Sequence, residues 1–271
     1  MLICLGIIFS SFTGAANAYS GDSTGDSKED LRVYIEGTKN EITKVRKQFK
    51  TKRDFGDEGF TAIVNPEELK AIKKNRKLKV QKVSIVKIAQ TNILDIVFPA
   101  AVPSSRTPWG IRAIYSEPAI AQTTGGKGIK VAVLDTGTSK THKDLASKIE
   151  QCKNFTSVFS TIVNNSCTDR NGHGTHVSGT ILANGGSDGS GIFGVAPEAK
   201  LWAYKVLGDS GTGYSDDIAA AIRHAADQAA STGSRVIISM SLGSSSKDSL
   251  IAGAVDYAYS KGVLVVAAAG N

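Results

Sequence analysis

Three polar residues stand where the sequence pattern predicts chemistry. Asp135 directly follows an apolar run at residues 131–134, and Asn271 follows a second apolar run at residues 263–269. His173 lies between two glycines at the predicted start of a helix, and we expect their missing side chains to let a substrate backbone approach. A carboxylate and an imidazole can act together in acid–base catalysis, and a side-chain amide can donate to a developing negative charge.

A second histidine, His176, makes a metal site an alternative to acid–base chemistry. It lies one helical turn after His173, and paired histidines can bind zinc. The zinc-protease pattern His-Glu-x-x-His is absent, so the sequence gives the zinc site little support.

The elements that must position these residues alternate between strand and helix. Near-continuous apolar or small residues predict strands buried on both faces at residues 129–135, 200–206, 235–240 and 263–269. Their alternation with helices predicts an α/β fold with a doubly wound, mostly parallel sheet. Sites in such sheets lie beyond the carboxyl ends of the strands, which is where Asp135 and Asn271 fall.

One helix between these strands has start and stop signals. We expect Ser215 to cap it, with Asp216 and Asp217 in its first turn, near the positive end of the helix. Gly233 marks its end. The residues expected to be buried recur at helical spacing: Ile218, Ala221, Ile222, Ala225 and Ala229.

Three motifs together resemble the subtilisin-like (subtilase) family of serine proteases. They are VAVLDTG at residues 131–137, NGHGTHVSGT at 171–180 and AAAGN at 267–271. The resemblance implies a secreted endopeptidase with catalytic Asp135 and His173, and with Asn271 as oxyanion-hole donor. The chain order Asp, His, Ser is that of subtilisin itself, the standard example of this arrangement. The Gly-Thr-Ser-Met-Ala nucleophile motif is expected beyond residue 271, so the parent protein should hydrolyse peptide bonds and this chain alone should be inactive.

The resemblance also implies a cleft that binds substrate by backbone pairing. The expected substrate-binding residues form two short segments: Gly211, Thr212 and Gly213, and Ser241, Leu242 and Gly243. Backbone pairing tolerates many side chains, so we expect broad specificity.

A structural calcium ion is the one cofactor that the resemblance implies. Asp144 follows Asp135 by nine residues, where many subtilases place a calcium ligand. Asp188, in the glycine-rich loop at residues 185–191, is the second expected ligand. Carboxylate oxygens suit Ca²⁺, which prefers hard ligands.

The N-terminal part of the chain predicts export and processing. Residues 1–18 combine a short apolar run with a small-x-small cleavage signature, which indicates a signal peptide and a secreted protein. Residues 31–91 look like the α+β propeptide, an intramolecular inhibitor, of many secreted subtilases. The expected elements there are strands at 31–35, 59–64 and 80–86 and a helix at 65–72. Residues 92–107 are expected to be a linker with the processing site, and residues 108–271 the N-terminal part of an incomplete catalytic domain.

Cys152 and Cys167 are the two cysteines expected to remain after export, because Cys4 would leave with the signal peptide. A lone pair of cysteines in an exported protein predicts a disulfide, with two free thiols as the alternative. The bridge would close a loop of about 15 residues, for which the chain-entropy model gives about 3 kcal/mol of stabilisation.

The net charge of +7 raises the question of a nucleic-acid partner. Residues 31–91 carry 16 Lys and Arg against 7 Asp and Glu, whereas residues 108–271 carry 14 against 13. The basic residues lack interleaved aromatic residues, which favours a solvated face. We therefore expect a monomer whose partners are peptide or protein substrates and its own propeptide, with no nucleic acid and no membrane after signal cleavage.

Two other classes of function remain open from the sequence. A catalytically inactive pseudoprotease, or a propeptide-type inhibitor or binding protein, would fit a natural chain that stops after residue 271. A nucleotide-binding α/β protein is disfavoured, because no glycine-rich phosphate loop follows the first strand of the predicted sheet.

Overall fold

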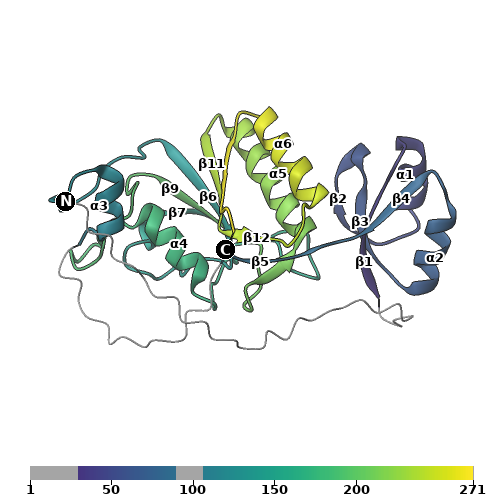
Figure 1. Ribbon diagram of the computed structural model, residues 1–271, viewed down its shortest axis with the longest axis horizontal. Helices are drawn as coiled ribbons and strands as arrows, with labels where there is room; N and C mark the ends of the chain where they lie inside the picture. Colours follow the sequence, from purple (N-terminus) through teal and green to yellow (C-terminus); the bar gives the residue numbers. More distant parts are fainter. Residues whose placement is uncertain (1–29, 90–105, 271) are drawn as a thin grey trace, which may run out of the picture.

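The computed structural model describes residues 30–89 and 106–270. The predicted signal peptide, residues 92–105 of the predicted linker and Asn271 lie outside the described residues. Figure 1 shows a small N-terminal domain on one side of a larger α/β domain, and one extended segment that runs from the first along the second.

A six-stranded sheet forms the centre of the larger domain. The strand order is β13 (Leu264–Ala267), β11 (Arg235–Met240), β6 (Ile129–Asp135), β9 (Lys200–Lys205), β7 (Ile149–Asn154) and β8 (Val163–Asn164). Neighbouring strands are parallel except for β7 and β8, which are antiparallel. The mostly parallel α/β fold expected from the sequence is confirmed, and Asp135 is the last residue of a middle strand.

Helices cover both faces of this sheet. They are α4 (His173–Leu182) on one face and α5 (Ser215–Thr232) and α6 (Ser249–Ser260) on the other, with the short α3 (Trp109–Tyr115) beside α4 (Figure 1). Val131 and Val133 of β6 belong to the apolar cluster on the α4 side. Ala132 and Leu134 belong to the cluster with α5 and α6. Burial on both faces explains why this strand is an uninterrupted apolar run.

The start of α5 differs from the expectation. The N-cap is Tyr214 and not Ser215, which is the first helical residue. The Ser215 hydroxyl is buried without a hydrogen-bond partner among the described residues, while its backbone N–H donates to the carbonyl of Ser84. The helix ends at Gly233 as predicted, because this residue adopts the left-handed conformation (φ 63°) that closes helices.

The N-terminal domain is an antiparallel sheet with helices on one face. The strand order is β2 (Thr51–Asp54), β3 (Phe60–Val64), β1 (Leu31–Gly37) and β4 (Leu78–Lys82), with helices α1 (Lys39–Arg46) and α2 (Pro66–Lys74) and a 3₁₀ turn η1 (Gly56–Glu58). Asn65 and Glu68 form a capping box that starts α2. The domain has its own core around Ile35, Ile42 and Phe60. Its other face packs on α5 and α6 of the larger domain through Tyr34, Phe55 and Val83.

The single strand predicted at residues 80–86 is wrong, because the structure divides it in two. Strand β4 ends at Lys82, and β5 (Ile85–Ile88) leaves the sheet and runs along the larger domain (Figure 1). There it forms the middle strand of a second sheet, between β10 (Thr212–Tyr214) and β12 (Leu242–Gly243). The split occurs because the hydrogen-bonding partners of β5 come from sequence-distant segments that a local pattern does not report.

Two further features complete the fold. Cys152 of β7 and Cys167 form a disulfide with their Cα atoms 5.1 Å apart, which ties the strand to the chain just before α4. A 3₁₀ turn, η2 (Ala146–Lys148), leads into β7. Within residues 30–89 and 106–270, no helix has both the length and the apolar character that crossing a bilayer requires.

Candidate active site

Asp135 and His173 meet at the carboxyl end of β6. The distance from His173 Nδ1 to Asp135 Oδ1 is 2.8 Å, and the backbone N–H of Thr136 donates to the same oxygen over 2.7 Å. An ionised carboxylate only accepts hydrogen bonds, so we infer that Nδ1 carries the proton and Nε2 has a free lone pair. An imidazole held in this way can accept a proton at Nε2.

The Asp135 carboxylate is poorly solvated. Its side chain is 1% exposed, and Oδ2 has no hydrogen-bond partner among the described residues. Burial raises the pKa of Asp135, and hydrogen bonds from His173 and Thr136 oppose that rise. A carboxylate with little water around it attracts a positive imidazole ring more strongly than an exposed one would.

Gly174 lets α4 approach β6 closely enough for this contact, and Gly172 shapes the start of the helix. A Cβ atom on Gly174 would lie 2.2 Å from the carbonyl oxygen of Gly137, which excludes any side chain there. The expectation that Gly174 leaves room for substrate is therefore wrong, because the room is taken by the strand end. Gly172 has no neighbour within 4 Å of such an atom, and its left-handed conformation (φ 95°) starts the helix.

Asp169 holds the turn before His173. The sequence pattern did not predict a role for this residue. Its Oδ1 accepts from the Thr136 hydroxyl over 2.9 Å and from the backbone N–H groups of Asn171 and Gly172 over 3.0 and 2.9 Å. Its Oδ2 accepts from the Thr175 N–H over 2.9 Å and from the Thr175 hydroxyl over 2.6 Å. Asp169 thus connects the residue after Asp135 to the turn that carries His173. An aspartate two residues before Asn171-Gly172 is the turn signal that could have found it.

Burial of Asp169 disfavours its charged form, but hydrogen bonds outweigh that effect. Those from Thr175 and Gly172 hold the pKa of the carboxyl below its ordinary value. Asp169 is therefore ionised at neutral pH, and its charge strengthens each of these hydrogen bonds.

The two predicted substrate-binding segments lie on either side of β5. Gly213 of β10 pairs with Val86 of β5, and Leu242 of β12 pairs with Ile88 of β5. Two further bonds extend the pairing: Ile88 N–H donates to Gly211 O over 2.9 Å, and Ala89 N–H donates to Ser241 O over 3.0 Å. The structure therefore brings both segments together around one extended strand.

The residues around Asp144 fit a bound cation. Asp144 is 2% exposed, and its Oδ1 is buried without a hydrogen-bond partner among the described residues. A Cβ atom on Gly191 would lie 1.6 Å from this oxygen, so the loop at residues 185–191 closes directly over it. A Cβ atom on Gly186 would lie 3.1 Å from Asp144 Oδ1 and 3.0 Å from Asp188 Oδ1, so both carboxylates face the same loop. Backbone carbonyls and water would have to complete the ligand set.

The comparisons with known proteins agree with this geometry. The model of the subtilase family matches residues 126–271, which is more than half of the chain. The chain belongs to the subtilase family.

Similar proteins give the extent of this match. Subtilisin of Bacillus sp. strain TA39 is 51% identical over 257 residues, which are 94% of this chain and 61% of that protein. The solved structure of Sphericase is 69% identical with a TM-score of 0.61, and covers 62% of this chain and 54% of its own. The epidermin leader peptide processing serine protease of Staphylococcus aureus is 24% identical, with a TM-score of 0.68 over 90% of this chain and 61% of its own, and shows the fold alone. The chain thus spans less than two thirds of these proteins.

His176, the residue behind the zinc alternative, is not joined to the pair. His176 lies one turn further along α4 and has no contact with Asp135 among the hydrogen bonds of the described residues. The described residues contain no group of three or more His, Cys, Asp or Glu side chains placed to hold a metal ion, so neither the zinc alternative nor the expected calcium at Asp144 and Asp188 has a full set of side-chain ligands among them. Asn271 lies outside the described residues.

Proposed function

We propose that the parent protein is a secreted serine endopeptidase in which His173 is the general base and Asp135 orients it. The observation that carries the proposal is the 2.8 Å contact between Asp135 and His173 at the end of β6. No described serine side chain forms a hydrogen bond with His173, so the nucleophile is proposed to come from outside the described residues.

In the proposed reaction His173 transfers the proton and Asp135 supports His173. His173 Nε2 takes the proton of the serine hydroxyl as the hydroxyl attacks the peptide carbonyl, and it returns that proton to the leaving amine. Asp135 fixes the tautomer and stabilises the imidazolium formed in between. Asn271 is proposed to donate to the oxyanion.

Strands β10 and β12 are proposed to hold the substrate. Both present backbone groups to an extended segment, as their pairing with β5 illustrates. Gly211 has a left-handed φ of 77°, and a Cβ atom on Gly213 would lie 2.4 Å from the carbonyl oxygen of Val206. Side chains at these two positions would therefore disturb the strand that the substrate pairs with.

The N-terminal domain is proposed to be an intramolecular inhibitor. Its β5 lies in the position between β10 and β12 that the proposal assigns to substrate, so a peptide cannot pair there at the same time. The domain would therefore hold the enzyme inactive until the segment after β5 is cut and the strand leaves.

The test is peptide hydrolysis by the full-length, processed protein and by its His173→Ala variant. In subtilisin itself the loss of the triad histidine costs a factor of about 10⁶ in kcat, and we expect a loss of that order here. The control is Lys127→Ala, since Lys127 is an exposed lysine outside the candidate site. Hydrolysis that survives His173→Ala unchanged would contradict the proposal.

A further inference from the structure

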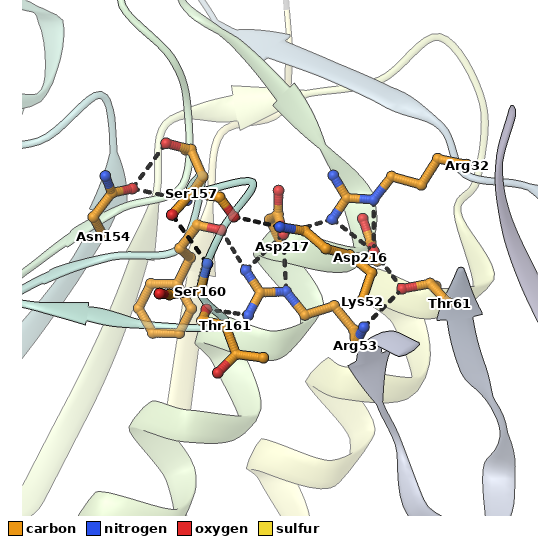
Figure 2. A network of polar contacts seen from close by, with 12 residues as sticks. Arg32, Lys52, Arg53, Thr61, Asn154, Ser157, Ser160, Thr161, Asp216 and Asp217 are labelled. Carbon is orange, nitrogen blue, oxygen red and sulfur yellow. Dashed lines mark hydrogen bonds and ion pairs between the residues drawn. The ribbon is translucent and has the colours of Figure 1, made fainter. Parts of the chain in front are cut away.

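Four charged side chains are buried between the N-terminal domain and helix α5. Arg32 of β1 and Arg53 of β2 meet Asp216 and Asp217 in the first turn of α5 (Figure 2). The side chains of Arg53, Asp216 and Asp217 are at most 3% exposed, and that of Arg32 is 10% exposed. The expectation of a solvated basic face is wrong for these two arginines.

The arginines hold both carboxylates in one network. Arg32 donates from Nε to Asp216 Oδ2 over 2.9 Å and from Nη2 to Asp217 Oδ1 over 2.7 Å. Arg53 donates to Asp217 Oδ1 from Nε over 2.9 Å and from Nη2 over 2.7 Å. The Thr61 hydroxyl donates to Asp216 Oδ2 over 2.6 Å. Two positive and two negative charges balance, so the network carries no net charge.

A loop of the larger domain, residues 155–161, supplies further acceptors. The Arg53 guanidinium donates to the backbone carbonyls of Phe155 and Thr161. Lys52 donates to the carbonyl of Ser157 (Figure 2). Arg53 therefore finds acceptors on two separate segments of the larger domain, and it reaches both only when the domains are docked.

The remainder of the interface is mostly apolar and less selective. Tyr34, Phe55 and Val83 share a core cluster with residues of α5 and α6. Apolar contacts tolerate side chains of similar size. A buried charge does not tolerate the loss of its partner, because the remaining ion stays out of water with nothing to neutralise it.

We propose that Asp216 and Asp217, with the carbonyls of residues 155–161, form a selective docking site for a domain that presents arginines at positions 32 and 53. The inference rests on the proposed propeptide function and adds which residues decide the pairing. After processing, the separated N-terminal domain binds a larger domain that carries Asp216 and Asp217. It binds much more weakly to a larger domain that carries neutral residues at these two positions. In the undocked larger domain the two carboxylates are tolerated, because water reaches them and they lie at the positive end of α5.

The experiment uses the full-length protein with His173→Ala, which prevents self-cleavage, and with a recognition site for an added protease in residues 92–105. Four versions are compared: the unchanged interface, Arg32→Met with Arg53→Met, Asp216→Asn with Asp217→Asn, and all four substitutions together. After cleavage between the domains, dilution of a fluorescently labelled sample gives the dissociation constant of each version. Circular dichroism before cleavage shows whether each version is folded.

We expect each mismatched version to bind at least about 30-fold more weakly than the unchanged one. The version with all four substitutions should recover most of that loss, because it leaves no unpaired charge. Glu58→Gln is the matched control: it removes the ion pair of Glu58 with Arg223, in which Glu58 is 57% exposed, and should weaken binding less than about fivefold. Equal dissociation constants for the mismatched and unchanged versions would overturn the proposal.

Two measurements keep the outcome interpretable. If a double substitution prevents folding, Arg53→Lys and Asp217→Asn are tested singly, and each should still weaken binding more than the control does. Inhibition of peptide hydrolysis is measured separately, with the active protein. Selective binding without inhibition would refute the propeptide function and leave the docking site standing, whereas inhibition by mismatched and unchanged domains alike would refute the docking site.

Discussion

Among single residues, the Asp135–His173 pair depends on a carboxylate outside it. Asp169 accepts hydrogen bonds from residues on both sides of the pair, namely from Thr136, which follows Asp135, and from the turn and first residues around His173. Because Asp169 accepts hydrogen bonds from several residues of this turn, we expect the direction of the imidazole ring to depend on this carboxylate.

Asp169→Asn tests this dependence. An amide offers one acceptor oxygen and turns an NH₂ group toward the donors of Thr175 or Gly172, so the turn should shift. We expect kcat of the full-length enzyme to fall by about 10²-fold with a smaller change in KM, since small misplacements of catalytic groups have effects of this size. Steady-state kinetics on a peptide substrate measure it. The control Asp256→Asn, at an exposed position on α6, should leave both constants unchanged, and equal kinetics for the two variants would count against the role of Asp169.

Among elements, the loop at residues 185–191 is shaped by the carboxylate beneath it. Glycine at positions 186 and 191 leaves space for Asp144, whose Oδ1 has no donor among the described residues. A loop closed over an unpaired buried carboxylate would be costly without a cation. We therefore propose a calcium ion at Asp144, with Asp188 as an outer ligand that already accepts from Ser190.

Removal of calcium should therefore lower thermal stability. A ligand present at 100 times its Kd stabilises by about 2.7 kcal/mol, which corresponds to about 5–10 °C in Tm for a domain of this size. We expect a chelator to lower Tm by that amount in the unchanged protein and by much less in Asp144→Asn. Asp57→Asn, at an exposed site of the N-terminal domain, should keep the full shift. A melting temperature that does not respond to chelation would contradict a bound calcium ion at Asp144.

On the scale of the whole molecule, one half-buried histidine links folding to pH. His224 of α5 packs against the rings of Phe155 and Tyr204, and its Nε2 has no hydrogen-bond partner among the described residues. Burial, with a smaller contribution from Lys153, lowers the pKa of His224 from 6.5 to about 4. The unfolded chain therefore binds a proton below pH 6.5 that the folded protein takes up only near pH 4.

This difference predicts that acid destabilises the fold through His224. The contribution of the neutral ring is fully present above pH 6.5 and is lost as the pH falls through about 4. We expect the free energy of unfolding to drop by about 1–2 kcal/mol over this interval, less than the full pKa difference gives, because part of the ring is exposed to screening solvent. Urea unfolding at several pH values, compared with His224→Phe, isolates the effect. A variant with the same pH dependence as the unchanged protein would show that other groups cause it.

Much of the larger domain follows from the sequence by itself. The run at residues 129–135 is apolar on both faces and ends in an aspartate, so it determines a buried parallel strand with Asp135 at its active end. The glycine at 233 determines the end of α5 through the left-handed conformation that it adopts. The motif around His173 determines the family. These features are local, because periodicity, turn chemistry and motif order are carried by neighbouring residues.

Only the tertiary structure decided the contacts between distant segments. Strand β5 does not belong to the N-terminal sheet, because its backbone hydrogen bonds go to β10 and β12 of the larger domain. Gly174 is required by the carbonyl of Gly137, a contact that no spacing in the sequence reveals. Arg32 and Arg53 count toward the basic charge of the N-terminal domain, yet they are buried against Asp216 and Asp217. Whether a charge is solvated or paired depends on what folds against it, and that is settled only when the whole chain packs.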